Sequence, residues 1–538
     1  MNSPTPDLRG VQTLPELLAF RAALTPHSEA YRACDPGTGQ WISLTWAQTQ
    51  ERVQQCSRAI AASGLPQGAR IAILLPNGLA WIEAYMAATQ IGLYVTPINW
   101  HLTGEEAAYI VENCDARVLI ADARYAPIAV HAARQAGLGE QQCYAAGGAI
   151  PGFSPYETLL TGQPDTPPDE RSAGTLMLYT GGTTGKPKGV LRPLPDGKPE
   201  AVAQLGQLLF YLFDVKPGEG VHLCQGPLYH SAPAGFSTGA LHMGQTLVLM
   251  DKWDAETALR LIESHGVTAT HMVPTMFVRL LRLPEETRRR YDLSSLRNAI
   301  HAAAPCPVEI KRQMLAWWGP VIYEYYGATE GGGTLVKPQE WLAHPGTVGR
   351  AWPGIQVKIL DDEGRELPPG QIGTIYMTAG LGDFEYHKDP DKTRSVKRDG
   401  MITAGDLGHL TAEGWLYISD RRTDLILSGG ANISPAEIEG GVPPWRVLPP
   451  GKAPPVVRRA LTSEQIRGIA ARIAAADFER FPPNLHRERY VDLRTVVLNR
   501  VHSVQARRFA RPTPADSTDR QKALDELVAA VRALEPSE

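Results

Sequence analysis

Cysteine is scarce and scattered in this chain. Its 538 residues include six Cys, and no two of them form a CxxC pair. A disulfide framework or a zinc site of closely spaced thiols is therefore not expected, whereas reduced thiols in the cytoplasm are. The chain also lacks an uninterrupted apolar run of the roughly 18 residues that span a bilayer. Its polar start, MNSPTPDLRG, has no apolar signal-peptide segment, so we expect a cytoplasmic protein without a transmembrane segment.

An excess of charge of one sign is missing as well. The formal net charge is −4, and charged residues make up 20% of the chain against 43% hydrophobic residues. This balance is typical of a globular protein and gives no support for binding to nucleic acid or to a membrane surface. A chain of 538 residues exceeds what one hydrophobic core usually serves, so two or more domains are expected.

Short apolar runs alternate with helical patterns through most of the chain. The runs are Arg70–Leu75, Arg117–Ala121, Thr246–Met250 and Gly266–Pro274, and Trp81–Ile91 is one of the helical segments between them. Strands separated by helices predict an α/β protein with largely parallel sheets.

The pattern changes twice towards the end of the chain. After about Val357, the turn residues Asp361–Gly364 and Thr411–Gly414 separate alternating strands, which predicts hairpins. From Gly441 to Glu538 there are fifteen Arg but only two Lys and three Gly, and helical patterns dominate. We therefore expect a domain boundary near Arg421, with one domain over residues 1–421 and a C-terminal region over 422–538.

The most distinctive local feature is Leu178–Val190, LYTGGTTGKPKGV. Its small residues let the backbone approach a ligand, and its hydroxyl and ammonium groups can bind a polyphosphate. The residues concerned are Gly181, Gly182, Gly185, Gly189, Thr180, Thr183, Thr184, Lys186 and Lys188. The segment is not a Walker loop, because Pro187 stands where that motif has Ser or Thr. The alternative is a flexible Gly/Lys surface loop.

From about Leu14 to Glu439 the chain resembles the adenylate-forming superfamily of acyl-CoA synthetases, luciferases and peptide-synthetase adenylation domains. TGGTTGKPKG resembles the family's phosphate loop, with Gly181 where Ser is commoner. The resemblance implies an AMP-binding domain of two α/β subdomains with parallel-rich sheets and a small β-barrel-like subdomain, followed by a small C-terminal region. It also implies that the loop residues Thr180 to Gly185 and Lys188 bind nucleotide, with Thr183 and Lys188 in catalytic roles.

Two further motifs follow in family order. PLYHSAP resembles the segment that lines the acyl pocket, which makes His230 a candidate; a buried structural histidine is the alternative. Ala303, Ala304 and Pro305 in HAAAPCP resemble the backbone stretch that faces adenine, and on their own would indicate only a turn of small residues.

The motif YYGATEGGG resembles the family segment that holds the nucleotide and its metal. Tyr326 would stack on adenine beside Gly327, Thr329 would lie near the α-phosphate, and Glu330 would be both catalytic and a magnesium ligand, because a hard cation prefers carboxylate oxygen. Asp406 in TAGD would bind the ribose hydroxyls, although a turn aspartate would have the same sequence. Arg421 would contact the ribose and phosphates.

The resemblance implies a ligase that uses ATP, Mg²⁺ and coenzyme A. A carboxylic acid would attack ATP to give acyl-AMP, and the CoA thiol would then take the acyl group. Gly327 stands where acetate-specific relatives have Trp, and Gly331, Gly332 and Gly333 add no side-chain volume, which predicts a medium- or long-chain, aromatic or polycyclic acid. Two alternatives stay open: transfer to a carrier protein, and an impaired homologue that binds nucleotide and acid. A homodimer is also left open.

The resemblance ends at about Glu439. Relatives continue through an αβ domain whose lysine reaches the adenylation site, but the Gly-Lys pair nearest to that pattern is Gly451–Lys452, soon after Glu439. Lys452 could serve after a large deletion, or the domain has been replaced by another sequence. We favour replacement, because so short a segment cannot build a lid that holds a lysine against the site. Slow adenylation is therefore expected.

Overall fold

The computed structural model describes residues 22, 25–34, 40–180, 186–194, 210–216, 218, 220–380, 382–421, 426–428 and 431–433. The chain divides into two compact units, residues 1–432 and 433–538, and every described helix belongs to the first. The predicted site residues Gly181, Gly182, Thr183, Thr184 and Gly185 lie outside the described residues, as do Lys452 and the region after 433. For Arg421 only the backbone is described.

The first sheet is six-stranded and entirely parallel, in the order β7-β6-β5-β3-β4-β8. Its strands are β3 (Arg70–Leu74), β4 (Tyr94–Pro97), β5 (Ala116–Asp122), β6 (Cys143–Ala146), β7 (Ser154–Pro155) and β8 (Thr175–Leu176). The helices around it are α2 (Trp46–Ala62), α3 (Leu79–Thr89), α4 (Gly104–Asn113) and α5 (Ala126–Gln135), with short 3₁₀ turns at Ala123–Tyr125, Glu140–Gln142 and Tyr156–Leu159.

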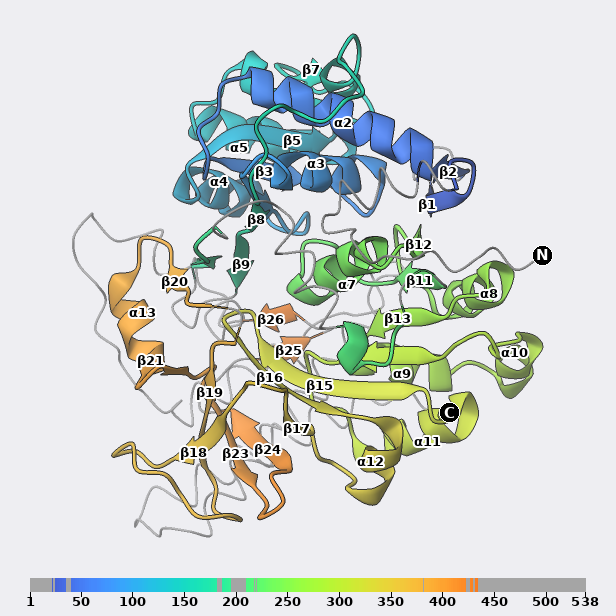
Figure 1. Ribbon diagram of the computed structural model, residues 1–538, viewed down its shortest axis with the longest axis vertical. Coiled ribbons are helices and arrows are strands. Elements are labelled where there is room, and N and C mark those ends of the chain that lie inside the picture. Colours follow the sequence, from blue (N-terminus) through green and yellow to red (C-terminus); the bar gives the residue numbers. More distant parts are fainter. Residues whose placement is uncertain are drawn as a thin grey trace, which may run out of the picture. The chain divides into compact units, whose positions relative to one another are not determined.

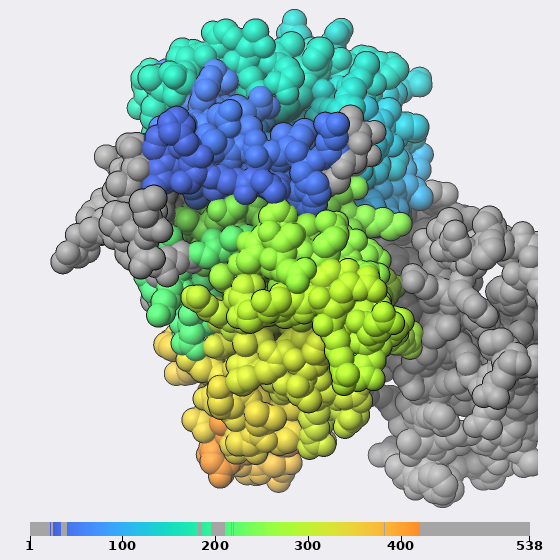
Figure 2. All heavy atoms as spheres, turned by 90° about the vertical axis from the view of Figure 1, so that its right-hand side faces the viewer, coloured from blue at the N-terminus to red at the C-terminus, as the bar shows by residue number. Residues whose placement is uncertain are grey.

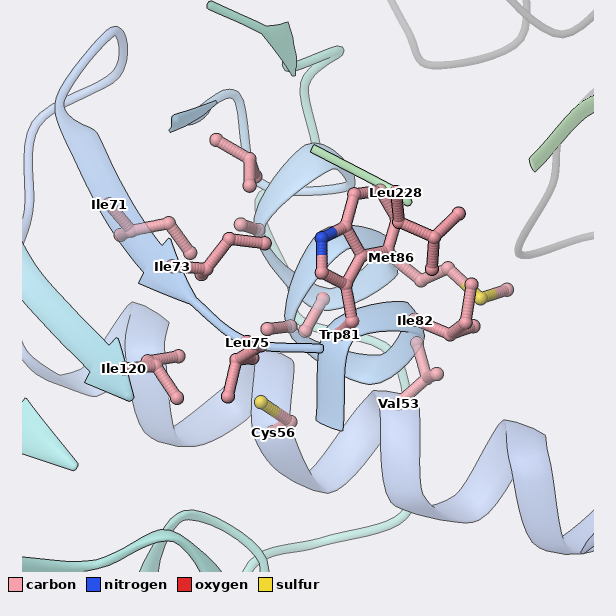
Figure 3. Close-up of a cluster of buried hydrophobic side chains, with 14 of the residues drawn as sticks. Val53, Cys56, Ile71, Ile73, Leu75, Trp81, Ile82, Met86, Ile120 and Leu228 are labelled. Atoms are coloured by element: carbon pink, nitrogen blue, oxygen red, sulfur yellow. The ribbon is translucent and has the colours of Figure 1, made fainter. Parts of the chain in front are cut away.

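After Arg70, strand β3 is apolar and buried at every position. Ile71 and Ile73 pack with α2 and α3, whereas Ala72 and Leu74 pack with α4 and α5. Successive side chains of a strand point to opposite faces, so a strand covered on both sides buries residues at consecutive positions and is largely apolar. Figure 3 shows the first of these clusters, in which the strand's isoleucines face Trp81 of α3.

The second sheet has nine strands in the order β17-β16-β15-β14-β13-β11-β12-β1-β2. The strands from β15 to β1 are parallel to one another, and β2, β16 and β17 are antiparallel additions at the two edges. Their bounds are β1 (Glu29–Cys34), β2 (Trp41–Thr45), β11 (Val221–Cys224), β12 (Thr246–Leu249), β13 (Ala269–Met272), β14 (Asn298–His301), β15 (Ile322–Ala328), β16 (Gly331–Val336) and β17 (Arg350–Ala351).

Helices cover both faces of the second sheet. Helix α7 (Ser231–His242) packs on one face, while α8 (Ala255–His265), α9 (Pro274–Leu281) and α11 (Val308–Trp318) pack on the other. Two short helices, α10 (Glu285–Arg290) and α12 (Pro338–Ala343), lie at the periphery (Figure 1). In the space-filling view the N-terminal residues (blue) adjoin residues of the second sheet (green), as the pairing of β1 with β12 requires (Figure 2). These two sheets confirm the predicted α/β class.

Two further sheets are antiparallel, and the hairpins predicted after Val357 lie in the first of them. A six-stranded sheet contains β18 (Val357–Leu360), β19 (Gly373–Thr378), β21 (Lys397–Arg398), β22 (Met401–Ile402), β23 (Asp406–Leu410) and β24 (Leu416–Arg421). A three-stranded sheet joins β9 (Leu178–Thr180), β10 (Lys188–Leu191) and β20 (Glu385–Tyr386), which α13 (Pro390–Val396) follows. The short strands β25 (Ile426–Ser428) and β26 (Ala431–Ile433) pair with each other. Among the described residues, no helix is long and apolar enough to cross a membrane.

Candidate active site

Three of the predicted motifs lie at the ends of parallel strands of the second sheet. His230 comes after β11, Ala303 comes after β14, and Tyr326 lies near the end of β15. The carboxyl ends of parallel strands lie at one edge of a sheet, which is where α/β proteins bind their ligands. The structure thus brings the predicted acyl-pocket, adenine and metal residues to the same edge.

The predicted phosphate loop is the connection of a hairpin. Thr180 at the end of β9 lies opposite Lys188 at the start of β10, so the two ends of the predicted loop lie side by side. Helix α4 supports this base, because the Tyr109 hydroxyl donates to the Pro187 carbonyl oxygen at 3.3 Å and the Lys186 ammonium lies 4.9 Å from the centre of the Tyr109 ring. The backbone at the base of the loop is therefore fixed to a helix of the first sheet.

Lys188 and Glu330 meet at one tyrosine, Tyr386 of β20. The Lys188 ammonium lies 5.7 Å from the centre of the Tyr386 ring, and the Tyr386 hydroxyl donates to Glu330 Oε1 at 2.7 Å. Lys188 also lies 3.5 Å from Asp389 Oδ2. Burial lowers the pKa of Lys188 and nearby Lys392 lowers it further, while Asp389 opposes both effects. The cation beside the loop and the predicted metal ligand thus contact the same tyrosine.

Glu330 stands at the tip of the β15–β16 hairpin. Ala328 pairs with Gly331, so Thr329 and Glu330 are the two residues of a tight turn. A half-buried carboxylate suits a hard divalent cation. Within the described part of the chain, no group of three or more His, Cys, Asp or Glu side chains could hold a metal alone. Mg²⁺ commonly takes only one or two carboxylates and completes its shell with phosphate and water, so the donors present fit that ion bound together with a nucleotide.

A second group of predicted nucleotide residues gathers where β15 meets β23. The Tyr326 hydroxyl donates to Asp406 Oδ2 at 2.7 Å, and the Asp406 side chain is buried. Asp406 lies opposite Arg421 across the β23–β24 pair. Three residues predicted to bind adenine, ribose and phosphate are therefore adjacent in space, although they come from positions far apart in the sequence.

The two remaining predicted segments lie at the same sheet edge. Ala303 has φ +73°, a backbone conformation that non-glycine residues rarely adopt and that often marks a functional turn. Ala304 and Pro305 continue that turn. His230 is half-buried at the N-terminus of α7, with its ring 4.5 Å from that of Tyr229. Burial and the nearby His101 lower the pKa of His230 to about 4, so its ring is neutral at physiological pH.

Residues 18–380 match the family model described as AMP-binding enzyme. The chain belongs to the AMP-binding enzyme family. It is 30% identical over 440 residues to the fatty acid–[acyl-carrier-protein] ligase ScoC of Streptomyces coeruleorubidus, and the match covers 80% of this chain and 81% of that protein. It is also 30% identical over 466 residues to the long-chain-fatty-acid–CoA ligase FadD13 of Mycobacterium tuberculosis, over 86% of this chain and 88% of the relative.

A solved structure agrees with these sequence comparisons. The o-succinylbenzoate coenzyme A synthetase MenE of Bacillus subtilis, in complex with AMP, has a TM-score of 0.63 and 25% identity, over 79% of this chain and 81% of its own. The predicted membership of the adenylate-forming superfamily and the α/β fold are thereby confirmed.

Several glycines of this AMP-binding enzyme do not have the roles predicted from the sequence. Gly331, Gly332 and Gly333 do not leave space for a large acid, because a Cβ atom at Gly331 would overlap the Ala379 carbonyl oxygen and one at Gly333 would lie 2.6 Å from the Trp352 ring. Gly189 likewise packs against Met177 rather than a ligand, since a Cβ there would lie 2.5 Å from the Met177 methyl group. These glycines let protein segments approach one another closely.

Sequence reasoning missed two residues at this site. Tyr386 joins Lys188 to Glu330, and Arg192 donates from Nη2 to the Thr329 carbonyl oxygen at 3.0 Å. Neither residue lies in a pattern that spacing alone would single out, because their partners are 56 and 137 positions away. The one available signal was that Arg192 is the second residue after the phosphate-loop motif.

Proposed function

We propose that this AMP-binding enzyme is an ATP-dependent acyl-CoA ligase, which activates a carboxylic acid as acyl-AMP and transfers the acyl group to coenzyme A. The observation that carries the proposal is the contact of Tyr386 with both Lys188 and Glu330. A cation and a carboxylate that contact the same tyrosine can act on one metal-bound polyphosphate.

In the first step the substrate carboxylate would attack the α-phosphorus of ATP, forming the mixed anhydride and releasing pyrophosphate. Lys188 would stabilise the charge that develops on the phosphate oxygens, and Tyr326, Asp406 and Arg421 would hold the nucleoside in line for attack. Mg²⁺, when bound, supplies charge neutralisation on the phosphates, and Glu330 is the residue that would hold it. Thr180, Thr183, Thr184 and the loop glycines Gly181, Gly182 and Gly185 would add hydroxyl and backbone N–H donors.

In the second step the CoA thiol would lose its proton and attack the acyl carbonyl carbon, and AMP would leave with the bonding electrons. The neutral His230 ring would shape the acyl pocket rather than supply charge, since its pKa of about 4 keeps it unprotonated. A carrier-protein thiol is the second candidate acceptor, because the relative ScoC is by name an acyl-carrier-protein ligase.

The proposed acid is larger than acetate: medium- or long-chain, aromatic or polycyclic. A Cβ atom at Gly327 would also lie close to protein, 3.1 Å from the Gly332 carbonyl oxygen. With the glycine argument removed, support comes from two relatives that are by name fatty-acid ligases. Pyrophosphate exchange should give a higher kcat/KM with decanoate than with acetate. Equal values would contradict the proposed acid class while leaving the reaction type intact.

The experiment that tests the reaction is ATP–pyrophosphate exchange against a panel of carboxylic acids, with hydroxylamine trapping of the acyl-AMP. Addition of CoA should replace the hydroxamate by a thioester, whereas a carrier protein should do so if it is the true acceptor. ATP binding without any exchange would instead identify an impaired homologue. Comparison with a chain ending at Glu439 tests whether the region beyond it, including Lys452, contributes.

A further inference from the structure

The hairpin tip that carries Thr329 and Glu330 is held by groups from other segments. Tyr386 binds the Glu330 carboxylate, and the Gly332 amide donates to the Ala379 carbonyl oxygen at 3.3 Å. The third tether is Arg192, whose Nη2 donates to the Thr329 carbonyl oxygen at 3.0 Å. A two-residue turn at the end of a hairpin needs such tethers if its side chains are to keep one position.

Arg192 is itself anchored on two further sides. Its Nη1 donates to the Gly382 carbonyl oxygen at 3.3 Å, and its own carbonyl oxygen accepts from the Tyr94 hydroxyl at 2.5 Å. Tyr94 belongs to β4 of the first sheet, and Gly382 lies shortly before β20. Arg192, which directly follows β10, therefore contacts three other segments. These are β4 of the first sheet, the segment before Tyr386 and the tip of the β15–β16 hairpin.

The guanidinium group suits this position for geometric reasons. Its planar fork presents several N–H donors in fixed directions, so it can bind two carbonyl oxygens of different segments at once. A lysine ammonium is a single point on a flexible stem and holds such a pair less firmly. Arg192 is half-buried, with the carboxylates of Glu330 and Asp383 as the charged groups around it.

We propose that Arg192 is a positioning residue of the adenylating site, which fixes Thr329 and Glu330 in the place where they meet the metal-bound nucleotide. The inference rests on the proposed function and extends it to a residue outside the recognised motifs. Arg192 acts through the hairpin tip and forms no bond to the reacting atoms.

The charge of Arg192 and its hydrogen bonds have opposite effects on a cation at Glu330. A guanidinium near the carboxylate repels Mg²⁺, so loss of the charge alone would strengthen Mg²⁺ binding. Loss of the tether would weaken it, because partners that orient a metal ligand typically contribute about 10- to 100-fold in affinity. The direction of change therefore distinguishes positioning from a purely electrostatic effect.

The test is titration calorimetry of ATP binding without acid at a series of Mg²⁺ concentrations, for the full chain and for Arg192→Leu and Arg192→Lys. We expect the Mg²⁺ concentration that gives half of the affinity gain to rise about 10- to 100-fold in Arg192→Leu, and less in Arg192→Lys. At saturating Mg²⁺, pyrophosphate exchange should show lower kcat with little change in the KM for ATP, because a misplaced tip impairs the reaction more than nucleoside binding.

Arg58 provides a matched control. Its guanidinium also joins backbone carbonyls, those of Thr166 and Pro167 at 3.1 and 2.6 Å, together with the Asp169 carboxylate, but it lies on α2, a helix of the first sheet. Arg58→Leu should change the melting temperature as much as Arg192→Leu does and leave the Mg²⁺ dependence unaltered.

Each outcome of the calorimetry supports or overturns this role. Stronger Mg²⁺ binding in Arg192→Leu would mean that Arg192 acts only through its charge, and would overturn the proposal. An Mg²⁺ dependence identical to that of the unchanged protein would also overturn it. If the leucine variant fails to fold, the lysine variant keeps the charge and weakens the tether, so weaker Mg²⁺ binding supports the role and unchanged binding overturns it. If the unchanged protein binds no ATP with or without Mg²⁺, the proposed function falls and the role of Arg192 with it; if only the variants contradict expectation, the proposed function stands.

Discussion

Glu83 and Glu330 of this AMP-binding enzyme each lie beside a tyrosine and a basic residue, with different results. Glu83 of α3 is fully buried and accepts from Arg52 at 2.5 and 3.2 Å and from the Tyr156 hydroxyl at 3.1 Å. Glu330 is half-buried at a hairpin tip and accepts from Tyr386, while the Arg192 guanidinium is directed at a backbone carbonyl instead. A carboxylate already saturated by protein donors stabilises the fold, whereas one whose neighbouring cation binds elsewhere retains capacity for a ligand.

The largest expected difference lies in stability. Glu83→Ala leaves a guanidinium and a tyrosine hydroxyl without their buried acceptor, and should lower the free energy of unfolding by about 3 kcal/mol, the lower end of the range for broken buried pairs because Arg52 is partly exposed. Glu330→Gln should change it by less than about 0.5 kcal/mol. Urea unfolding of both variants measures this, and equal losses would remove the distinction between the two clusters.

The next largest effect concerns activity at Lys188. Lys188→Met removes the ammonium that is placed for phosphate charge, and pyrophosphate exchange should fall by about 10² to 10³. Lys188→Arg keeps the charge with different geometry and should recover part of the rate. Arg52→Met is the corresponding change in the buried cluster, and it should lower the unfolding midpoint without this loss of specific activity.

The two tyrosines offer the closest matched pair. Tyr386→Phe removes the hydrogen bond to Glu330 but keeps the ring beside Lys188, so the Mg²⁺ requirement of ATP binding should rise about 10-fold or more. Tyr156→Phe removes the corresponding bond to Glu83 and should cost only stability, about 1 kcal/mol. Calorimetry at varied Mg²⁺ separates the two. An unchanged Mg²⁺ dependence in Tyr386→Phe would mean that this tyrosine does not orient Glu330.

The smallest expected effect is a shift of the alkaline pH at which kcat/KM for ATP falls. Burial lowers the pKa of Lys188, so near and above that pKa the folded protein binds fewer protons than the unfolded chain. Between the lowered pKa and the ordinary lysine value of about 10.4, stability contributed by this group rises with pH while the active cation is lost. The kcat/KM for ATP should therefore fall at a lower pH than for an ordinary lysine. Lys188→Arg should move this fall in kcat/KM to a higher pH. If the pH of the fall does not change, the deprotonation of another group causes it.

Much of this architecture was predictable from local sequence, and part of the site was not. The run Arg70–Leu75 was recognisable as a strand because both faces of β3 are buried, and Thr411–Gly414 as a turn because its residues favour one. Glu330 and Tyr326 could be nominated because they lie in a contiguous motif. Tyr386 and Arg192 could not, because their function depends on contacts between distant segments. Gly331–Gly333 were noticed for the wrong reason, since Ala379, Met377 and Trp352 occupy the space beside them.

The pairing of β1 with β12 has a consequence for biosynthesis. Tyr31 lies beside Leu247, so the strand that leaves the ribosome early has its parallel neighbour encoded far downstream. Until the chain has been translated through Leu249, the edge of β1 that pairs with β12 has no neighbouring strand. Contacts of such long sequence separation form slowly, and an unpaired strand of this kind invites association with other nascent chains. Translation past β12, rather than completion of the first sheet, is thus the point at which this edge of β1 becomes protected.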